Sequence, residues 1–258
     1  MRVARFTTGT EPAYAVVEGP EGQETLAVLD SDPLMHPVRP TGQRVPLVEA
    51  RLLAPVIPRS KVVCVGKNYA EHAAEMGGPA PEEPLIFLKP NTSVIGPGDG
   101  IVYPVQTENL HYEGELAVVI SRIARDVPAS RCAEVIFGYT VGNDVTARDL
   151  QARDGQWTRA KGFDTFCPLG PWIVTDLDPS DLALTTTVNG ELRQAGRTSQ
   201  MVYDVATLLA YITSVMTLLP GDVVLTGTPA GVGPMHPGDE VAVSIEGIGT
   251  LRNPVVKR

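Results

Sequence analysis

The chain has 258 residues, 43% of them hydrophobic and 20% charged, with a formal net charge of −9. These values are typical of a globular protein with a sizeable core. The negative charge argues against nucleic acid as a partner, because phosphates would be repelled and the lysines and arginines form no cluster. Three scattered cysteines without a C-x-x-C pair, together with a polar N-terminal segment, predict a cytoplasmic protein.

Residues 1–55 are predicted to form a small β appendage. Short apolar runs at 3–6, 14–17 and 25–29 have the composition of strands and are separated by glycine- and proline-rich stretches. Two prolines within residues 54–58 favour an extended linker to the rest of the chain. We therefore expect two units, the appendage over 1–55 and a larger domain over 56–258.

A strand at 61–66 is followed by a predicted helix, with Asn68 at its N-cap and Glu71 three residues later. His72 and Glu75 are three residues apart on this helix and hence lie on one face. A carboxylate can hold an imidazole in one tautomer and leave its second nitrogen free to take a proton from water. A solvated surface pair is the alternative.

The segment 111–120 carries two carboxylates at the mouth of an apolar strand. Glu113 and Glu115 point to the same face, because side chains alternate along a strand. Two like charges side by side repel each other unless a cation lies between them, and carboxylate oxygens suit Mg²⁺, Mn²⁺ or Ca²⁺. Two solvated acids on an edge strand are the alternative. The strand has no other charge before Arg122, which favours a site.

A third carboxylate, Asp144, stands in a turn after the next predicted strand. Loops at strand ends often carry function, although a turn aspartate also serves as a cap. With Glu113 and Glu115 it offers three hard oxygen donors, an incomplete octahedron whose open positions water or a chelating substrate would fill. Arg148 and Gln151 follow, and either orient these ligands or a substrate, or form ordinary ion pairs.

The C-terminal third of the chain is predicted to be rich in strands, at 183–189, 222–226 and 240–245. The apolar stretch 202–219 is interrupted by Asp204, so it is expected to be a buried or interface helix rather than a membrane span. Frequent short strands, with 25 glycines and 23 prolines, predict a mostly β fold with a few helices, of the α+β class.

A glycine-rich turn over residues 226–233 follows one of these strands. It lacks the G-K-[ST] of a nucleotide-binding loop. The backbone amide of Gly227 and the hydroxyl of Thr228 are suited to an anion, although plain turn chemistry explains them equally well.

Five ordered motifs resemble the C-terminal domain of fumarylacetoacetate hydrolases. They cover roughly residues 56–258 and read GKNYAEHAAEMG, YEGELAVVI, GNDVTARDLQ, W-x-x-x-K-G-F-D-T-F-C-P-L-G-P-W and GDVVLTGTPAGVG. The resemblance implies a rolled, mixed β-sheet core with a small N-terminal β appendage. It also implies a homodimer and an enzyme that uses Mg²⁺ or Mn²⁺ to act on β-diketo acids or related 2-oxo acids.

The resemblance further implies roles for single residues. The metal ligands would be Glu113, Glu115 and Asp144, and His72 with Glu75 would be a catalytic dyad on a mobile lid. Three carboxylates around a divalent ion leave about −1, so an ammonium nearby would offset this charge and steady a developing enolate. The residue implied for this catalytic role is Lys161. Substrate contacts are implied for the loop residues Thr228 and Gly227. Arg148, Gln151 and Tyr69 are further candidates for substrate contact from their positions beside the predicted site residues.

The leading hypothesis is hydrolysis of a C–C bond in an acylpyruvate or fumarylpyruvate. His72 would activate water, and the leaving fragment would be an enolate bound to the metal and to Lys161. The same enolate would serve isomerisation of 2-hydroxyhepta-2,4-diene-1,7-dioate, in the catabolism of aromatic compounds, or decarboxylation of oxaloacetate. Nothing in the sequence separates these reactions. A non-catalytic metal-binding protein with the same fold is the alternative from another class.

Overall fold

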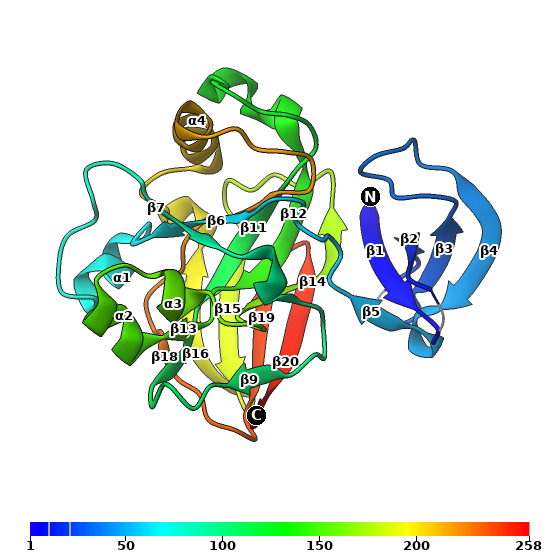
Figure 1. Ribbon diagram of the computed structural model, residues 1–258. Helices are drawn as coiled ribbons and strands as arrows, with labels where there is room; N and C mark the ends of the chain where they lie inside the picture. Colours follow the sequence, from blue (N-terminus) through cyan, green and yellow to red (C-terminus); the bar gives the residue numbers. More distant parts are fainter. Residues whose placement is uncertain (10, 21, 258) are drawn as a thin grey trace.

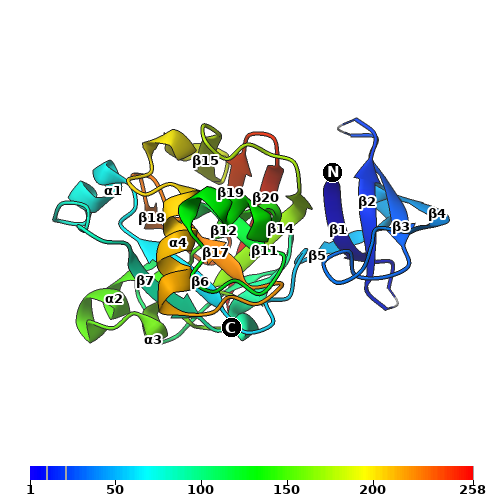
Figure 2. The same ribbon diagram turned by 90° about the horizontal axis from the view of Figure 1, so that it is seen from above.

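The N-terminal part of the chain forms a small antiparallel sheet that extends the edge of a larger one. In the computed structural model, which describes residues 1–9, 11–20 and 22–257, its strands pair in chain order: β1 (Arg2–Thr7), β2 (Ala13–Glu18), β3 (Thr25–Leu29) and β4 (Pro40–Pro46). β1 also pairs with β5 (Arg51–Leu53) and with β14 (Cys167–Val174) of the main body. Figures 1 and 2 show these blue strands beside the body, beyond β14.

The sheet continues through the body on the other side of β14. Its further strands, in spatial order, are β12 (Ile136–Asn143), β11 (Gly114–Ile120), β17 (Val223–Leu225), β6 (Val62–Gly66) and β7 (Leu85–Lys89). β17 and β6 are parallel, and the other neighbours are antiparallel. Every residue of β11 is buried. Its nearly continuous apolar sequence suits a strand that is covered on both faces.

A second sheet packs against the first. Its strands, in spatial order, are β16 (Glu191–Arg197), β15 (Ala183–Val188), β19 (Glu240–Ile245), β20 (Gly249–Lys257) and β9 (Ile101–Tyr103). Leu116 and Val118 of β11 share one buried core with Leu184 of β15 and Val243 of β19. The protein is therefore mostly β with mixed sheets, which confirms the predicted fold class.

Smaller pairings complete the β structure near the site. β10 (Leu110–Tyr112) lies between β13 (Thr146–Ala147) and β18 (Gly233–Pro234). β8 (Val94–Ile95) pairs with β14. The sequence pattern does not predict β4 or β16, whose residues are mostly exposed. Both strands lie at sheet edges, where little apolar surface is needed.

The helices of the described residues are short. They are α1 (Ala70–Glu75), α2 (Arg148–Asp154), α3 (Thr158–Lys161) and α4 (Val205–Val215), with 3₁₀ helices η1 (Leu47–Glu49), η2 (Asn91–Ser93), η3 (Ala129–Val135) and η4 (Thr198–Gln200). Among these helices, none is long and apolar enough to cross a membrane.

α4 occupies the apolar stretch that the sequence assigned to a buried or interface helix. Asp204 caps it, accepting a hydrogen bond from the backbone N–H of Thr207 at 2.8 Å. Leu208 and Ile212 are buried in the core, so much of the apolar surface is covered within one chain. The homodimer stays a prediction, which a molecular mass from light scattering would check.

The predicted N-cap role of Asn68 is wrong. The helix α1 starts after Tyr69, and no side chain caps its first turn. The Asn68 amide instead donates to the carbonyls of Tyr203 (3.0 Å) and Thr226 (2.8 Å), and its oxygen accepts from the Tyr203 N–H (2.9 Å). Asn68 is buried, and buried backbone groups need a partner within the protein. The exposed first residues of the helix can instead bond to water.

Candidate active site

Three buried carboxylates lie close together at the junction of β10 and β11 and at the C-terminal end of β12. Glu113 lies between β10 and β11, Glu115 lies in β11, and Asp144 follows β12. The strand register pairs Gly114 with Asn143, and the Asp144 N–H donates to the Glu113 carbonyl at 2.9 Å. One oxygen from each carboxylate lies within 4.8 Å of the others. The structure therefore brings the three predicted metal ligands together.

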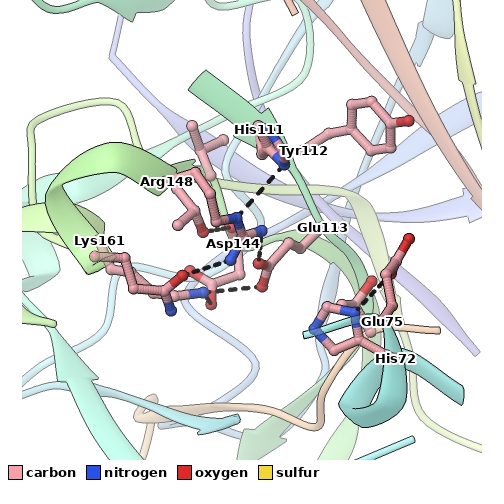
Figure 3. A network of polar contacts seen from close by, with 12 residues as sticks. His72, Glu75, His111, Tyr112, Glu113, Asp144, Arg148 and Lys161 are labelled. Atoms are coloured by element: carbon pink, nitrogen blue, oxygen red, sulfur yellow. Dashed lines mark hydrogen bonds and ion pairs between the residues drawn. The ribbon is translucent and has the colours of Figure 1, made fainter. Parts of the chain in front are cut away.

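Cations contact two of these carboxylates. Lys161 Nζ lies 2.8 Å from Glu113 Oε2 and 2.6 Å from Asp144 Oδ2. Lys89 Nζ lies 2.5 Å from Asp144 Oδ1, and Arg148 donates to Glu113 Oε1. Figure 3 shows Lys161 and Arg148 converging on Glu113. Burial raises the pKa of Glu113, but the charges of Lys161 and Arg148 outweigh it and hold that pKa below its usual range.

Glu115 is the carboxylate of the triad that forms no ion pair with the described residues. Its residue is 1% exposed, and within the described part of the chain its hydrogen-bond partner is the Gly227 N–H, 2.7 Å from Oε2. Burial, reinforced by the charges of Asp144 and Glu113, holds the pKa of Glu115 well above its usual range. Such a group needs a proton or a bound cation. Three hard oxygen donors, one of them lacking a counter-charge, fit Mg²⁺ or Mn²⁺.

The charge balance at the triad differs from the predicted one. The sequence indicates Lys161 as the counter-charge, but Lys89 and Arg148 contact the same carboxylates. Three cations therefore face three carboxylates, and these charges cancel when all three carboxylates are ionised. Lys161 alone would balance the value of about −1 predicted for a divalent ion and its carboxylates, so the added charges of Lys89 and Arg148 would leave the site with its ion positive. This arrangement favours an anionic substrate.

Lys89 is a site residue that the sequence did not reveal. It is 1% exposed and closes β7, whose antiparallel pairing with β6 brings it to the triad. A lysine before a proline in a short strand has no distinguishing signal in the sequence. The aromatic neighbours of Lys161 were also missed: its Nζ lies 4.9 Å from the ring centroid of Phe87 and 5.9 Å from that of Trp157. These rings cover the ammonium and contribute cation–π attraction.

Arg148 and Gln151 belong to a network around Glu113. Arg148 Nη1 donates to Gln151 Oε1 at 2.5 Å, and its Nε lies 3.5 Å from His111 Nδ1. Burial, followed by the charge of Arg148, lowers the pKa of His111 to about 4, so this imidazole is neutral at pH 7. The contacts show an ion pair between Arg148 and Glu113, and a role of Arg148 in substrate binding stays a prediction.

The predicted dyad is formed on α1. His72 Nδ1 lies 3.2 Å from Glu75 Oε2, and His72 is 4% exposed. The Gly231 N–H lies 3.3 Å from both Glu75 oxygens, and the Gly231 carbonyl accepts a hydrogen bond from the Tyr112 hydroxyl at 2.9 Å. Figure 3 shows His72 and Glu75 beside Glu113. The other ring nitrogen, Nε2, is therefore available to take up or donate a proton.

Both the backbone conformation and the close surroundings of position 231 require a glycine. Its φ is +96°, and a Cβ there would lie 2.3 Å from the Arg193 carbonyl oxygen. Any other residue would be strained and would push the loop outward. We call Tyr112, Gly231 and Glu75 the latch, because together they join the strand before Glu113 to the helix that carries His72.

A cavity of about 320 Å³ opens on these groups. Seven predicted site residues line it, namely His72, Glu113, Glu115, Arg148, Gln151, Lys161 and Thr228. The other lining residues are Val65, Gly66, Lys67, Met76, Ala152 and Trp157. The volume suits a small molecule.

Of the other predicted substrate contacts, Tyr69 and Gly227 do not line this cavity, and the Thr228 hydroxyl, which does, is bonded within the protein. Tyr69 lines a separate, smaller hollow, and its buried hydroxyl has no hydrogen-bond partner among the described residues. Gly227 gives its N–H to Glu115. The Thr228 hydroxyl donates to the Gly114 carbonyl (2.8 Å) and accepts from Gln194 Nε2 (2.8 Å). The loop therefore supports the triad strand, and a role in substrate binding stays a prediction for these residues.

Family comparison agrees with this site. The model of the fumarylacetoacetate (FAA) hydrolase C-terminal family matches residues 61–256, and the model named Rv2993c-like, N-terminal, matches residues 1–55. The chain belongs to the fumarylacetoacetate hydrolase family. Its relatives include enzymes named as isomerases, as an oxaloacetate tautomerase and as a hydrolase, and the chain is an enzyme of this family.

Individual relatives cover most or all of the chain. Protein Rv2993c of Mycobacterium tuberculosis is 54% identical over 100% of this chain and 99% of that protein. The structure of 5-carboxymethyl-2-hydroxymuconate delta-isomerase from Mycobacterium smegmatis is 53% identical, with a TM-score of 0.93 and 100% of both chains covered. That of 2-hydroxyhepta-2,4-diene-1,7-dioate isomerase from Mycobacterium marinum is 52% identical, with a TM-score of 0.93, covering 100% of this chain and 99% of that one. Human oxaloacetate tautomerase FAHD2A, mitochondrial, is 45% identical over 82% of this chain and 71% of that protein.

Proposed function

We propose that this enzyme moves a proton between the keto and enol forms of a 2-oxo acid at a divalent-metal site. The observation that carries the proposal is the convergence of Glu115, Lys161 and His72 on one cavity, with no cation of the described residues paired with Glu115. Relatives named as isomerases and as an oxaloacetate tautomerase support placing this reaction before C–C hydrolysis.

Glu113, Glu115 and Asp144 would hold the ion. When bound, Mg²⁺ or Mn²⁺ would supply a Lewis acid that polarises the 2-oxo group and acidifies the adjacent C–H. The Lys161 ammonium, already 2.6 Å from Asp144 Oδ2, offsets negative charge that develops on the substrate oxygen.

His72 is the proposed base and acid. Its Nδ1 is held by Glu75, so its Nε2 is available to take a proton from the carbon next to the oxo group and to return one. Met76 and Trp157 supply apolar surface to the same cavity, and this surface keeps water away from the enolate. The latch holds Glu75, and through it the orientation of the His72 imidazole toward a substrate in the cavity.

Hydrolysis of an acylpyruvate-type C–C bond is the second candidate. The observation that favours it is the His72–Glu75 pair, because an oriented imidazole also activates water. Decarboxylation of oxaloacetate would use the same enolate without that water.

Product analysis with a panel of substrates tests the proposal. The panel is enol-oxaloacetate, the seven-carbon 2-hydroxydienedioate, acetylpyruvate and fumarylpyruvate, each followed by NMR with Mg²⁺ and with EDTA. We expect metal-dependent isomerisation of at least one of the first two, and a large loss of rate with His72→Ala. If the enzyme cleaves acylpyruvates and isomerises neither, hydrolysis replaces isomerisation as its function.

A further inference from the structure

Lys67 is a cavity-lining cation that no part of the proposed reaction uses. Its side chain is half-buried and lines the cavity together with His72 and Glu115. Lys161 and Arg148, the other cations of the lining, are both paired with Glu113. Lys67, in contrast, makes no hydrogen bond or ion pair with any residue that the structure describes.

The backbone around Lys67 is held in place. Its φ is +56°, in the left-handed region that residues other than glycine seldom adopt. The next residue, Asn68, is locked by its side chain to Tyr203 and Thr226, and its carbonyl accepts from the Val202 N–H at 2.8 Å. An uncommon conformation that neighbouring contacts maintain is typical of functional positions. Lys67 therefore occupies a fixed place in the cavity wall.

The charges of the cavity indicate what this lysine would meet. With its carboxylates ionised, as they would be around a divalent ion, the triad cancels the charge of its three cations, so the ion would make that end positive and suit the 2-oxo carboxylate of a substrate. The ammonium of Lys67, which pairs with none of the described residues, adds a further positive charge to the lining. Much of the remaining wall is apolar, at Val65, Met76 and Trp157. A substrate with one carboxylate would leave the ammonium without a partner in a partly desolvated place.

We propose that Lys67 binds the second carboxylate of a 2-oxo dicarboxylate and so selects dicarboxylates over 2-oxo monocarboxylates. This inference rests on the proposed function, because it assumes that a 2-oxo acid enters the cavity. It assigns the cavity a specificity residue in addition to its catalytic groups.

The test compares two substrates that differ at one end. Enzyme-catalysed exchange of the C3 protons in D₂O is measured by NMR for oxaloacetate and for 2-oxobutanoate, which carries a methyl group in place of the distal carboxylate. The variants are Lys67→Met, which keeps the length of the side chain without its charge, and Lys67→Arg, which keeps the charge. Lys257→Met, at an exposed residue of β20, is the control. Calorimetric binding of the unreactive 2-hydroxy acids (S)-malate and (S)-2-hydroxybutanoate gives a readout apart from turnover.

Loss of one charge-assisted contact should lower kcat/KM for oxaloacetate about 10- to 100-fold in Lys67→Met and weaken malate binding similarly. The values for 2-oxobutanoate and 2-hydroxybutanoate should not change, and Lys67→Arg should recover most of the loss. Equal losses for both substrates, or none for either, would overturn the role of Lys67.

The two proposals fail differently. If the unmodified enzyme exchanges the C3 protons of both acids without preference, the proposed function stands and the inference about Lys67 is wrong. If it exchanges neither acid with Mg²⁺ or Mn²⁺ present, the proposed function itself is wrong, and the inference that rests on it is overturned with it.

Discussion

The ammonium of Lys89 lies 2.5 Å from Oδ1 of Asp144, and both side chains are buried. Removing one partner of a buried ion pair leaves an uncompensated charge, which typically costs about 3–5 kcal/mol. We expect Lys89→Met to lower the free energy of unfolding by about that amount in EDTA. Urea unfolding measures it, with Lys257→Met as the control.

Divalent metal should reduce this loss. Without Lys89 the three carboxylates have two cations, so a bound ion replaces the missing charge and stabilises the folded state by mass action. Mg²⁺ should therefore raise the unfolding free energy of Lys89→Met more than that of the unmodified protein. Equal increments in the two proteins would show that Lys89 and the ion do not share Asp144.

Glu115 should matter for metal more than for folding. Its pKa is held high by burial and by the charges of Asp144 and Glu113, so a neutral side chain is well tolerated in the metal-free protein. We expect Glu115→Gln to weaken Mn²⁺ binding by more than the roughly 10- to 100-fold typical of an outer partner. Its unfolding free energy in EDTA should stay the same or rise. Unchanged Mn²⁺ affinity in a calorimetric titration would contradict a metal role for Glu115.

The latch gives a prediction about turnover. Tyr112→Phe removes the hydrogen bond to the Gly231 carbonyl, 2.9 Å long, and loosens the loop whose N–H contacts Glu75. Because the dyad acts during proton transfer, kcat should fall while KM changes little. Mn²⁺ affinity, measured on the same variant, should stay as in the unmodified enzyme. A parallel loss of metal affinity would mean that Tyr112 supports Glu113 instead.

Asp222 should make stability depend on pH. Burial raises its pKa, but contacts from Lys61 Nζ (2.8 Å), the Leu219 N–H (2.9 Å) and Ser60 outweigh burial and lower it. A lowered folded pKa stabilises the protein above the unfolded value, about 3.9, and this stabilisation is lost as pH falls through the folded pKa. Asp222→Asn should therefore cost about 1–3 kcal/mol at pH 7.

The same difference should shrink in acid. Unfolding by urea at pH 7 and near pH 3 measures it, with Glu49→Gln on the exposed 3₁₀ helix η1 as a control that should change little at either pH. A difference that stays constant over this range would contradict the role of the Asp222 carboxylate.

Much of the site follows from local sequence. Glu113 and Glu115 share a strand face because side chains alternate, and Asp144 falls opposite them because β11 and β12 pair in register. Lys161 stands in a motif whose resemblance already implied its role. Short apolar runs likewise predict the central strands β6, β11 and β17, since burial on both faces requires them. They do not predict β14, although it lies in the middle of the same sheet.

The rest depends on contacts that no local pattern contains. Lys89 meets Asp144 from 55 residues away, and Tyr112 meets Gly231 from 119 away. Asn68 has the pattern of a helix cap, yet it satisfies backbone groups 135 and 158 residues further on. In each case the packing of distant strands and loops determines which residue becomes the partner. A local sequence pattern therefore cannot predict these contacts.

The most direct test of the account is exchange of the C3 protons of a 2-oxo acid in D₂O, followed by NMR on one enzyme sample. The sample is measured as purified, after removal of metal with EDTA, and after addition of Mg²⁺ or Mn²⁺. We predict that exchange is lost in EDTA and returns with the ion. Glu113, Glu115 and Asp144 would hold that ion, and its positive charge would stabilise the enolate. Exchange that continues at the same rate after metal removal would contradict the account.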